Sequence, residues 1–175
     1  KSTNPVAVGD VVDYEMEGEE GVIKEIHPRK NYIIRKSINL SKQVQIIAAN
    51  VDQLFLIVTL INPVTTFGFI DRFLVGAEAY GIKTILLFNK IDLYQTEELK
   101  KELEQWQSIY KNAGYDYLEI SATEQEGLEE LKSIMKSKVS IFSGNSGVGK
   151  SSLINALDPN LNLRVNQISD YHKSG

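Results

Sequence analysis

Two different patterns of hydrophobic and polar residues divide the chain near residue 45. Before that point, short apolar runs over 11–14, 21–27, 32–35 and 43–48 are separated by turn residues. Runs of this length, bounded by glycine, proline and asparagine, predict short antiparallel strands. From residue 53 onward, apolar runs alternate with amphipathic stretches, which predicts a mostly parallel sheet covered on both faces.

The second part of the chain has clear signals for individual strands and helices. The expected strands are 54–59, 84–88, 115–120 and 139–142, and the expected helices are 67–80, 96–113, 128–135 and one that begins near Lys150. Thr96 is a suitable N-cap, and Leu99, Leu103 and Trp106 follow it at helical spacing. We therefore expect an α/β protein in which a small β-barrel over 1–45 precedes an α/β domain over 46–175.

Composition narrows the class of protein. The 175 residues carry 19 basic and 23 acidic side chains, and a net charge of −4 excludes nucleic-acid binding by overall positive charge. Cysteine is absent, which excludes disulfides, thiolate nucleophiles and cysteine-bound zinc within this chain. No apolar run reaches the ~18 residues that span a bilayer, so we expect no membrane segment. We expect a cytoplasmic monomer, and the start at Lys1 leads us to expect a piece of a longer protein.

A glycine-rich sequence follows the last expected strand. It reads Gly144-Asn145-Ser146-Gly147-Val148-Gly149-Lys150-Ser151, which is the phosphate-loop pattern. Glycines leave room for backbone N–H groups to face an anion, and the following helix adds its positive N-terminal end. Lys150 is placed to reach the β- and γ-phosphates, Ser151 to coordinate Mg²⁺, and Ser152 lies beside them. We expect Lys150 to face solvent while the site is empty; a glycine-rich turn without a ligand is the alternative.

Two further loops suggest which nucleotide is bound. Asn89-Lys90-Ile91-Asp92 follows the strand 84–88, and Ser121-Ala122 follows the strand 115–120. The Asp92 carboxylate can accept hydrogen bonds from N1–H and the exocyclic amine of guanine, a pair of donors that adenine lacks. We expect Asn89 to serve the other edge of the base, the Lys90 stem to pack over it, and a backbone N–H near Ala122 to meet the guanine carbonyl. All three loops follow the carboxyl ends of strands, and open α/β sheets bind ligands at these ends.

The order of these motifs resembles that of the circularly permuted P-loop GTPases, because the phosphate loop comes after the other two motifs instead of before them. Further stretches are similar to the RsgA family of small-subunit ribosome biogenesis GTPases. They are Val8-Gly9-Asp10-Val11-Val12, Ile23-Lys24-Glu25-Ile26-His27-Pro28-Arg29-Lys30-Asn31, Ala49-Asn50-Val51-Asp52-Gln53 and Ile70-Asp71-Arg72-Phe73-Leu74-Val75. The resemblance covers about residues 6–152.

This resemblance implies an N-terminal OB-fold barrel, a permuted GTPase domain, and GTP hydrolysis in late maturation of the 30S ribosomal subunit. It implies GTP, GDP and Mg²⁺ as ligands, the 30S subunit and 16S rRNA as partners, and a zinc-binding C-terminal domain outside this chain. The family's switch threonine and Asp-x-x-Gly motif are missing, so no catalytic residue is identified beyond the phosphate-stabilising Lys150. We expect these 175 residues alone to bind GDP about as well as GTP and to hydrolyse GTP negligibly.

Charge is segregated within the first part of the chain. The segment 10–20 is acidic and is expected to form a solvated hairpin, whereas the segment 24–42 is basic. OB-type barrels bind nucleic acid on such basic faces, although a solvated face is the alternative. The candidate RNA contacts are Lys24, Arg29, Lys30, Arg35 and Lys36. Two other functions stay open: an RNA-binding module with a vestigial nucleotide site, and a P-loop phosphotransferase that acts on a small metabolite.

Overall fold

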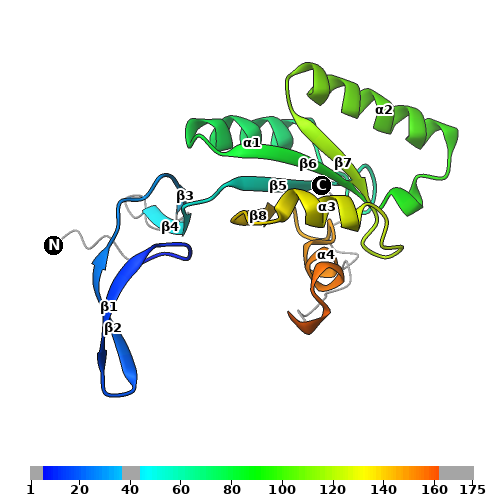
Figure 1. Cartoon of the computed structure of the whole chain (residues 1–175). Helices are drawn as coiled ribbons and strands as arrows, with labels where there is room; N and C mark the ends of the chain where they lie inside the picture. Colours follow the sequence, from blue (N-terminus) through cyan, green and yellow to red (C-terminus); the bar gives the residue numbers. More distant parts are fainter. Residues whose placement is uncertain (1–5, 37–43, 162–175) are drawn as a thin grey trace.

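A four-stranded parallel sheet forms the centre of the computed structural model, which describes residues 6–36 and 44–161 (Figure 1). Its strands are β5 (Gln53–Val58), β6 (Lys83–Asn89), β7 (Asp116–Ile120) and β8 (Ser140–Ser143). Their order across the sheet is β7-β6-β5-β8, and all three pairings are parallel. The α/β fold expected from the sequence is confirmed.

Four helices cover the two faces of this sheet. They are α1 (Phe67–Ala79), α2 (Glu97–Asn112), α3 (Leu128–Met135) and α4 (Lys150–Leu157), with short 3₁₀ helices η1 (Ile91–Leu93) and η2 (Pro159–Leu161). Helices α1 and α2 lie over one face, and α3 and α4 lie under the other (Figure 1). None of the described helices combines the length and the apolar character needed to cross a membrane.

Strand β5 explains why the sheet is buried on both sides. All six of its residues are buried, and successive side chains of a strand point to opposite faces. Leu54 and Leu56 therefore join the cluster under α1 and α2, where Trp106 is also buried, as its place on the apolar helix face predicted. Phe55 and Ile57 join the opposite cluster with α3 and α4. This continuous apolar run is the property that a central parallel strand requires.

The N-terminal part contains two antiparallel hairpins. Strands β1 (Val12–Glu17) and β2 (Glu20–Ile26) form one sheet, and β3 (Tyr32–Lys36) and β4 (Val44–Ala49) form another. The two sheets are separate within the described residues, so a closed barrel is not part of the described structure. Strand β4 also continues past residue 45, where the sequence pattern placed the domain boundary.

A polar junction attaches these hairpins to the central sheet. The Asn31 side chain accepts a hydrogen bond from Val51 N and donates one to Val51 O, both at 2.8 Å. Asn50 Nδ2 donates to Gly9 O at 2.9 Å. Asp52 accepts a hydrogen bond of 2.7 Å from the backbone N–H of Val139, immediately before β8. Residues 49–53, which the sequence analysis singled out, therefore connect the first hairpins to the strand that leads into the phosphate loop.

Candidate functional site

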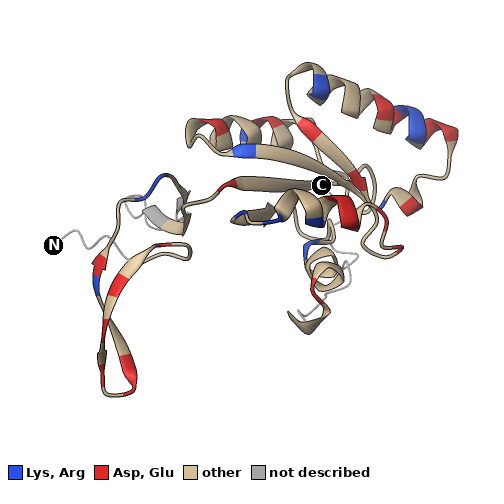
Figure 2. Ribbon diagram, viewed as in Figure 1, with Lys and Arg blue, Asp and Glu red and all other residues tan. Residues whose placement is uncertain are grey.

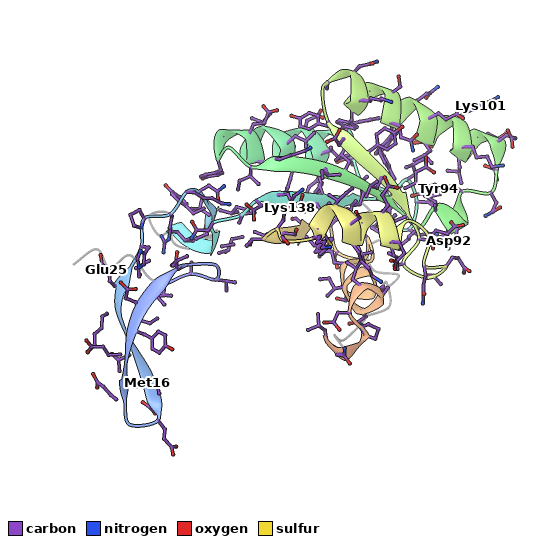
Figure 3. The ribbon with its side chains drawn as sticks, in the orientation of Figure 1. Met16, Glu25, Asp92, Tyr94, Lys101 and Lys138 are labelled. Atoms are coloured by element: carbon purple, nitrogen blue, oxygen red, sulfur yellow. The ribbon has the colours of Figure 1, made fainter. Side chains whose placement is uncertain are left out.

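The three expected ligand loops lie together at the carboxyl edge of the sheet. β6 leads into Asn89–Asp92, β7 leads into Ser121-Ala122, and β8 leads into the phosphate loop that ends at α4. Figure 3 labels Asp92 beside the end of β6, on the same side as the loops from β7 and β8. The remaining predicted residues lie on these same loops or in the first turn of α4: Ile91, Asn145, Ser146, Ser151 and Ser152.

The backbone of the phosphate loop adopts conformations and close contacts that favour glycine. Gly144, Gly147 and Gly149 have φ angles of 150°, 81° and 99°. A Cβ at Gly144 would lie 2.6 Å from Ile57 O, and one at Gly149 would lie 2.4 Å from Asn89 Nδ2. Helix α4 starts directly after this loop without a side-chain cap, so its first N–H groups are available to an anion.

Lys150 contacts its own loop instead of projecting into solvent. Its Nζ donates hydrogen bonds to Gly144 O at 2.9 Å and to Asn145 O at 2.6 Å. The side chain is partly buried, and this desolvation lowers the pKa of its ammonium group. The prediction of a solvent-facing lysine was therefore wrong, because the two carbonyl oxygens give the ammonium group partners inside the loop.

Asn89 connects the loop after β6 to the two neighbouring loops. It is 1% exposed, its Nδ2 donates to Val148 O at 2.8 Å, and its Oδ1 accepts from Ala122 N at 3.3 Å. These two hydrogen bonds satisfy the buried amide inside the protein, where an amide without partners would destabilise the fold. The expectation that Asn89 also serves one edge of the base stays a prediction.

Lys90 makes a second connection between loops. Its backbone is in the left-handed region at φ 67°. Nζ donates to Gly147 O at 2.8 Å and to Asn62 O in the loop between β5 and α1. Burial lowers the pKa of its ammonium group. The aliphatic stem consequently runs from the loop after β6 to the phosphate loop.

Asp92 is held by the third loop. The Ser121 hydroxyl donates to Asp92 Oδ1 at 2.6 Å and accepts from Glu124 N at 3.1 Å. Ser121 is fully buried, whereas Asp92 stays partly exposed. A serine that is fixed on both sides therefore orients a carboxylate that a ligand can still reach.

Comparison with known proteins identifies the family. A sequence model for the family described as RsgA GTPase matches residues 26–175, most of the chain. The chain belongs to the RsgA GTPase family. Proteins named small ribosomal subunit biogenesis GTPase RsgA are 57% identical in Flavobacterium psychrophilum and 50% identical in Porphyromonas gingivalis strain ATCC 33277, over the whole of this chain. These matches cover 55% and 56% of those proteins, so the chain spans about half the length of the curated relatives it matches.

Solved structures of similar proteins support the same assignment. YjeQ from Thermotoga maritima is 40% identical, with a TM-score of 0.76 over 94% of this chain and 55% of that chain. YloQ, described as a circularly permuted GTPase, is 34% identical, with a TM-score of 0.70 over 91% of this chain and 53% of that chain. The motif order inferred from the sequence of this RsgA family member is thus the permuted one.

The basic segment of this RsgA family member is largely paired with acidic residues. The Arg29 guanidinium donates to both carboxylate oxygens of Asp10, at 2.6 and 2.7 Å, and the Arg29 side chain is 8% exposed. The prediction of Arg29 as an RNA contact was wrong, and so was that of a solvated Asp10, because this bidentate pair is buried. Lys24 pairs with Glu15 and Glu17, and Lys30 pairs with Asp52. The side chains of Arg35 and Lys36 lie outside the described residues.

Acidic side chains surround this region. Figure 2 marks acidic residues along the β1–β2 hairpin, which is exposed along most of its length, as expected for the segment beyond Asp10. The described lysines of the basic segment are therefore close to carboxylates of the hairpin or of the junction. A strongly basic face is not formed by the described side chains.

Sequence reasoning missed one residue of the site. Tyr94 is 3% exposed, and its hydroxyl donates to Asn89 O at 2.7 Å and accepts from Leu60 N at 3.0 Å. The available signal was an aromatic residue in the short segment between the Asp92 motif and the Thr96 cap. The partner Leu60 could not be identified, because it is 34 positions away in the sequence.

Proposed function

We propose that this chain binds GTP and GDP with Mg²⁺, and that the protein to which it belongs hydrolyses GTP during late maturation of the small ribosomal subunit. The observation that carries the proposal is the contact of Asn89 with both neighbouring loops, which places Asp92 and the phosphate loop around one site. The names of the relatives support the biological role.

Guanine recognition is assigned to the loops after β6 and β7. The Asp92 carboxylate accepts from two neighbouring donors on guanine, N1–H and the exocyclic amine. Ser121 keeps that carboxylate in one orientation, so little side-chain entropy is lost when the nucleotide binds. Lys90 borders the base with its aliphatic stem while its charged end stays on Gly147 O.

Phosphate binding is assigned to the loop after β8. Backbone N–H groups around Gly147 and Gly149 and the start of α4 face the anion, and Lys150 adds a positive charge. Ser151 lies in the first turn of α4, where its hydroxyl is a suitable oxygen ligand for Mg²⁺, whose other positions phosphate oxygens and water can fill. Zinc, which the family resemblance placed in a further domain, has no cysteine ligand in this chain.

Hydrolysis depends mainly on positioning and on stabilising charge as the γ-phosphoryl group leaves. Lys150 can stabilise charge on the phosphates because its ammonium group already lies inside the loop. To bind them, it exchanges the carbonyl oxygens of Gly144 and Asn145 for phosphate oxygens. The residues of this chain therefore bind and neutralise the phosphates, and we assign none of them to the attacking water.

We further propose that the N-terminal hairpins belong to an OB-fold barrel that contacts 16S rRNA in the cytoplasm, in a protein that acts as a monomer. Exposed apolar side chains support the barrel: Tyr14, Met16 and Ile23 are 62%, 60% and 44% exposed, which suits an interior surface better than a solvated one. A hollow of about 620 Å³ next to β3 and β4 is lined in part by Ile34 and Ile46. The rRNA contact would use Lys24 and Lys30 and exclude Arg29.

The direct test is GTP turnover by the full-length protein with purified small ribosomal subunits. We expect turnover that small subunits stimulate and small metabolites do not, together with tighter binding to the subunit in the GTP state. Turnover stimulated by a metabolite would favour a phosphotransferase. Subunit binding without any turnover, unaffected by nucleotide, would favour an RNA-binding module whose nucleotide site is vestigial.

A further inference from the structure

The Tyr94 side chain connects two loops of the protein. It would touch neither the phosphates nor the base of a bound nucleotide. The ring is buried directly behind the turn that carries Asp92, and Figure 3 labels both residues at the end of β6. The Tyr94 hydroxyl donates to Asn89 O, before the turn, and accepts from Leu60 N, beyond the end of β5. One hydroxyl therefore uses both its donor and its acceptor capacity inside the protein.

Backbone hydrogen bonds close the turn that carries Asp92. Leu93 N donates to Lys90 O at 2.9 Å, and Tyr94 N donates to Ile91 O at 3.0 Å. These backbone bonds set the shape of η1 but not its position relative to the sheet. The Tyr94 side chain supplies the position, because it folds back over the turn to the carbonyl of Asn89.

The other partner gives the turn a firm anchor. Leu60 follows the buried strand β5 and is itself 2% exposed. Its loop is closed by two bonds between Thr59 and Thr65: Thr65 N donates to Thr59 O at 2.8 Å, and Thr59 N donates to Thr65 Oγ1 at 3.0 Å. Burial raises the pKa of Tyr94 to about 12, so the hydroxyl keeps its proton at neutral pH and can donate and accept together.

We propose that Tyr94 is a positioning residue for guanine recognition, which holds the Asn89–Tyr94 turn so that the Asp92 carboxylate meets N1–H and the exocyclic amine in line. Ser121 orients the end of the carboxylate, and Tyr94 fixes the backbone from which it extends. Two parallel hydrogen bonds need this control, since each weakens steeply as its angle closes. The inference rests on the proposed guanine-nucleotide function.

The test compares GDP with inosine diphosphate, which lacks the exocyclic amine, in the full-length protein. The ratio of their dissociation constants measures the contact between Asp92 and that amine. Tyr94→Phe removes one hydroxyl and keeps the ring. We expect it to weaken GDP binding about tenfold and to reduce the discrimination against inosine diphosphate about fivefold, as expected for a hydrogen bond to a charged group that loses alignment.

Tyr110→Phe is the matched control. Tyr110 is also 3% exposed, and its hydroxyl donates to Asp71 Oδ1 at 3.0 Å, in a contact between α1 and α2. A melting curve of each variant reports stability. We expect the control to keep the wild-type discrimination even where its melting temperature falls, because its hydroxyl joins α1 to α2 and not the turn that carries Asp92 to β5.

Two results would overturn the inference. One is a Tyr94→Phe protein that binds both nucleotides more weakly by the same factor, which would make the tyrosine purely structural. The other result would come from amide hydrogen exchange in the wild type. GDP binding should tighten the hydrogen bond between Leu60 N and the Tyr94 hydroxyl and slow exchange at Leu60, so an unchanged exchange rate would contradict the inference. A wild type that does not discriminate between the two nucleotides would instead contradict guanine recognition itself, and with it the proposed function.

Discussion

The Asn89 side-chain amide donates a hydrogen bond of 2.8 Å to the carbonyl oxygen of Val148. These two residues come from the base-reading loop and the phosphate loop, 59 positions apart in the chain. The same amide accepts from Ala122 N, so one buried side chain sets the spacing of all three loops. The distance between the Asn89–Asp92 loop and the phosphate loop is therefore fixed by contacts within the protein.

Gly149→Ala should disrupt this connection. The new methyl group would lie 2.4 Å from Asn89 Nδ2, at a φ of 99° that costs a non-glycine residue about 1–2 kcal/mol. We expect a melting temperature about 5 °C lower and GDP affinity at least about tenfold weaker, measured by calorimetry and thermal unfolding. Gly76→Ala in α1 is the control, because it has open space around it and should stabilise by about 0.5–1 kcal/mol. Equal behaviour of the two variants would contradict the role of the loop geometry.

Asp92→Asn should change which base is preferred. An amide can donate to the carbonyl that xanthine carries in place of the exocyclic amine of guanine, but it repels that amine with its own N–H groups. GDP affinity should fall by about 10- to 100-fold, while affinity for xanthosine diphosphate rises above that of the wild type. Calorimetry with both nucleotides measures this, and an unchanged order of preference would argue against Asp92 as the base-reading residue.

Lys150→Ala should affect the ligand more than the fold. The variant loses the charge that faces the phosphates, and GDP affinity should fall about 10- to 100-fold. Because Nζ also bonds to Gly144 O and Asn145 O, we expect a small loss of stability without nucleotide, below about 3 °C in melting temperature. Lys132→Ala, which removes an exposed lysine paired with Glu129, should change neither quantity. A large loss of stability with nearly unchanged affinity would show that Lys150 is structural.

Much of the fold could be predicted because the spacing of hydrophobic residues determines most of its strands and helices. The buried run of β5 and the apolar face of α2 each follow from periodicity, and Thr96 caps α2 as expected by accepting from Leu99 N. The three ligand loops could be placed as well, since strand ends in a parallel sheet meet at one edge. The close approach of the loop backbone at its glycines agrees with the motif.

The details that could not be predicted are the partners of polar side chains. Asn89 and Arg29 were each assigned to a ligand, and their bonds to Val148 and Asp10 within the protein were not foreseen. Tyr94 carried no motif at all. A sequence shows that a polar side chain is present, but its partner depends on contacts between segments that are distant in the chain, such as Leu60 with Tyr94.

The Asp10–Arg29 pair predicts a dependence of stability on pH. Hydrogen bonds from the Arg29 guanidinium hold the pKa of Asp10 below its ordinary value of 3.8, against the opposing effect of desolvation. A carboxyl group with a lowered pKa in the folded state stabilises the protein above that ordinary value, and this contribution is lost as the pH falls through the lowered pKa.

Urea unfolding from about pH 5 to pH 2 tests this directly. The wild type should lose more stability across this range than Asp10→Asn, which should be less stable than the wild type at neutral pH. Glu15→Gln, in the exposed part of the same hairpin, is the control and should follow the wild type. Parallel curves for the wild type and Asp10→Asn would contradict the assigned pair.

Titration of the wild-type full-length protein with GDP and with ADP tests the central claim most directly. Both diphosphates fit the phosphate loop, so any difference in affinity reports the base-reading loops. In the proposed site, Ser121 holds the Asp92 carboxylate, which would accept from two donors that guanine carries and adenine lacks. GDP should therefore bind at least about 100-fold more tightly than ADP. Equal affinity for GDP and ADP would contradict guanine recognition and the function proposed from it.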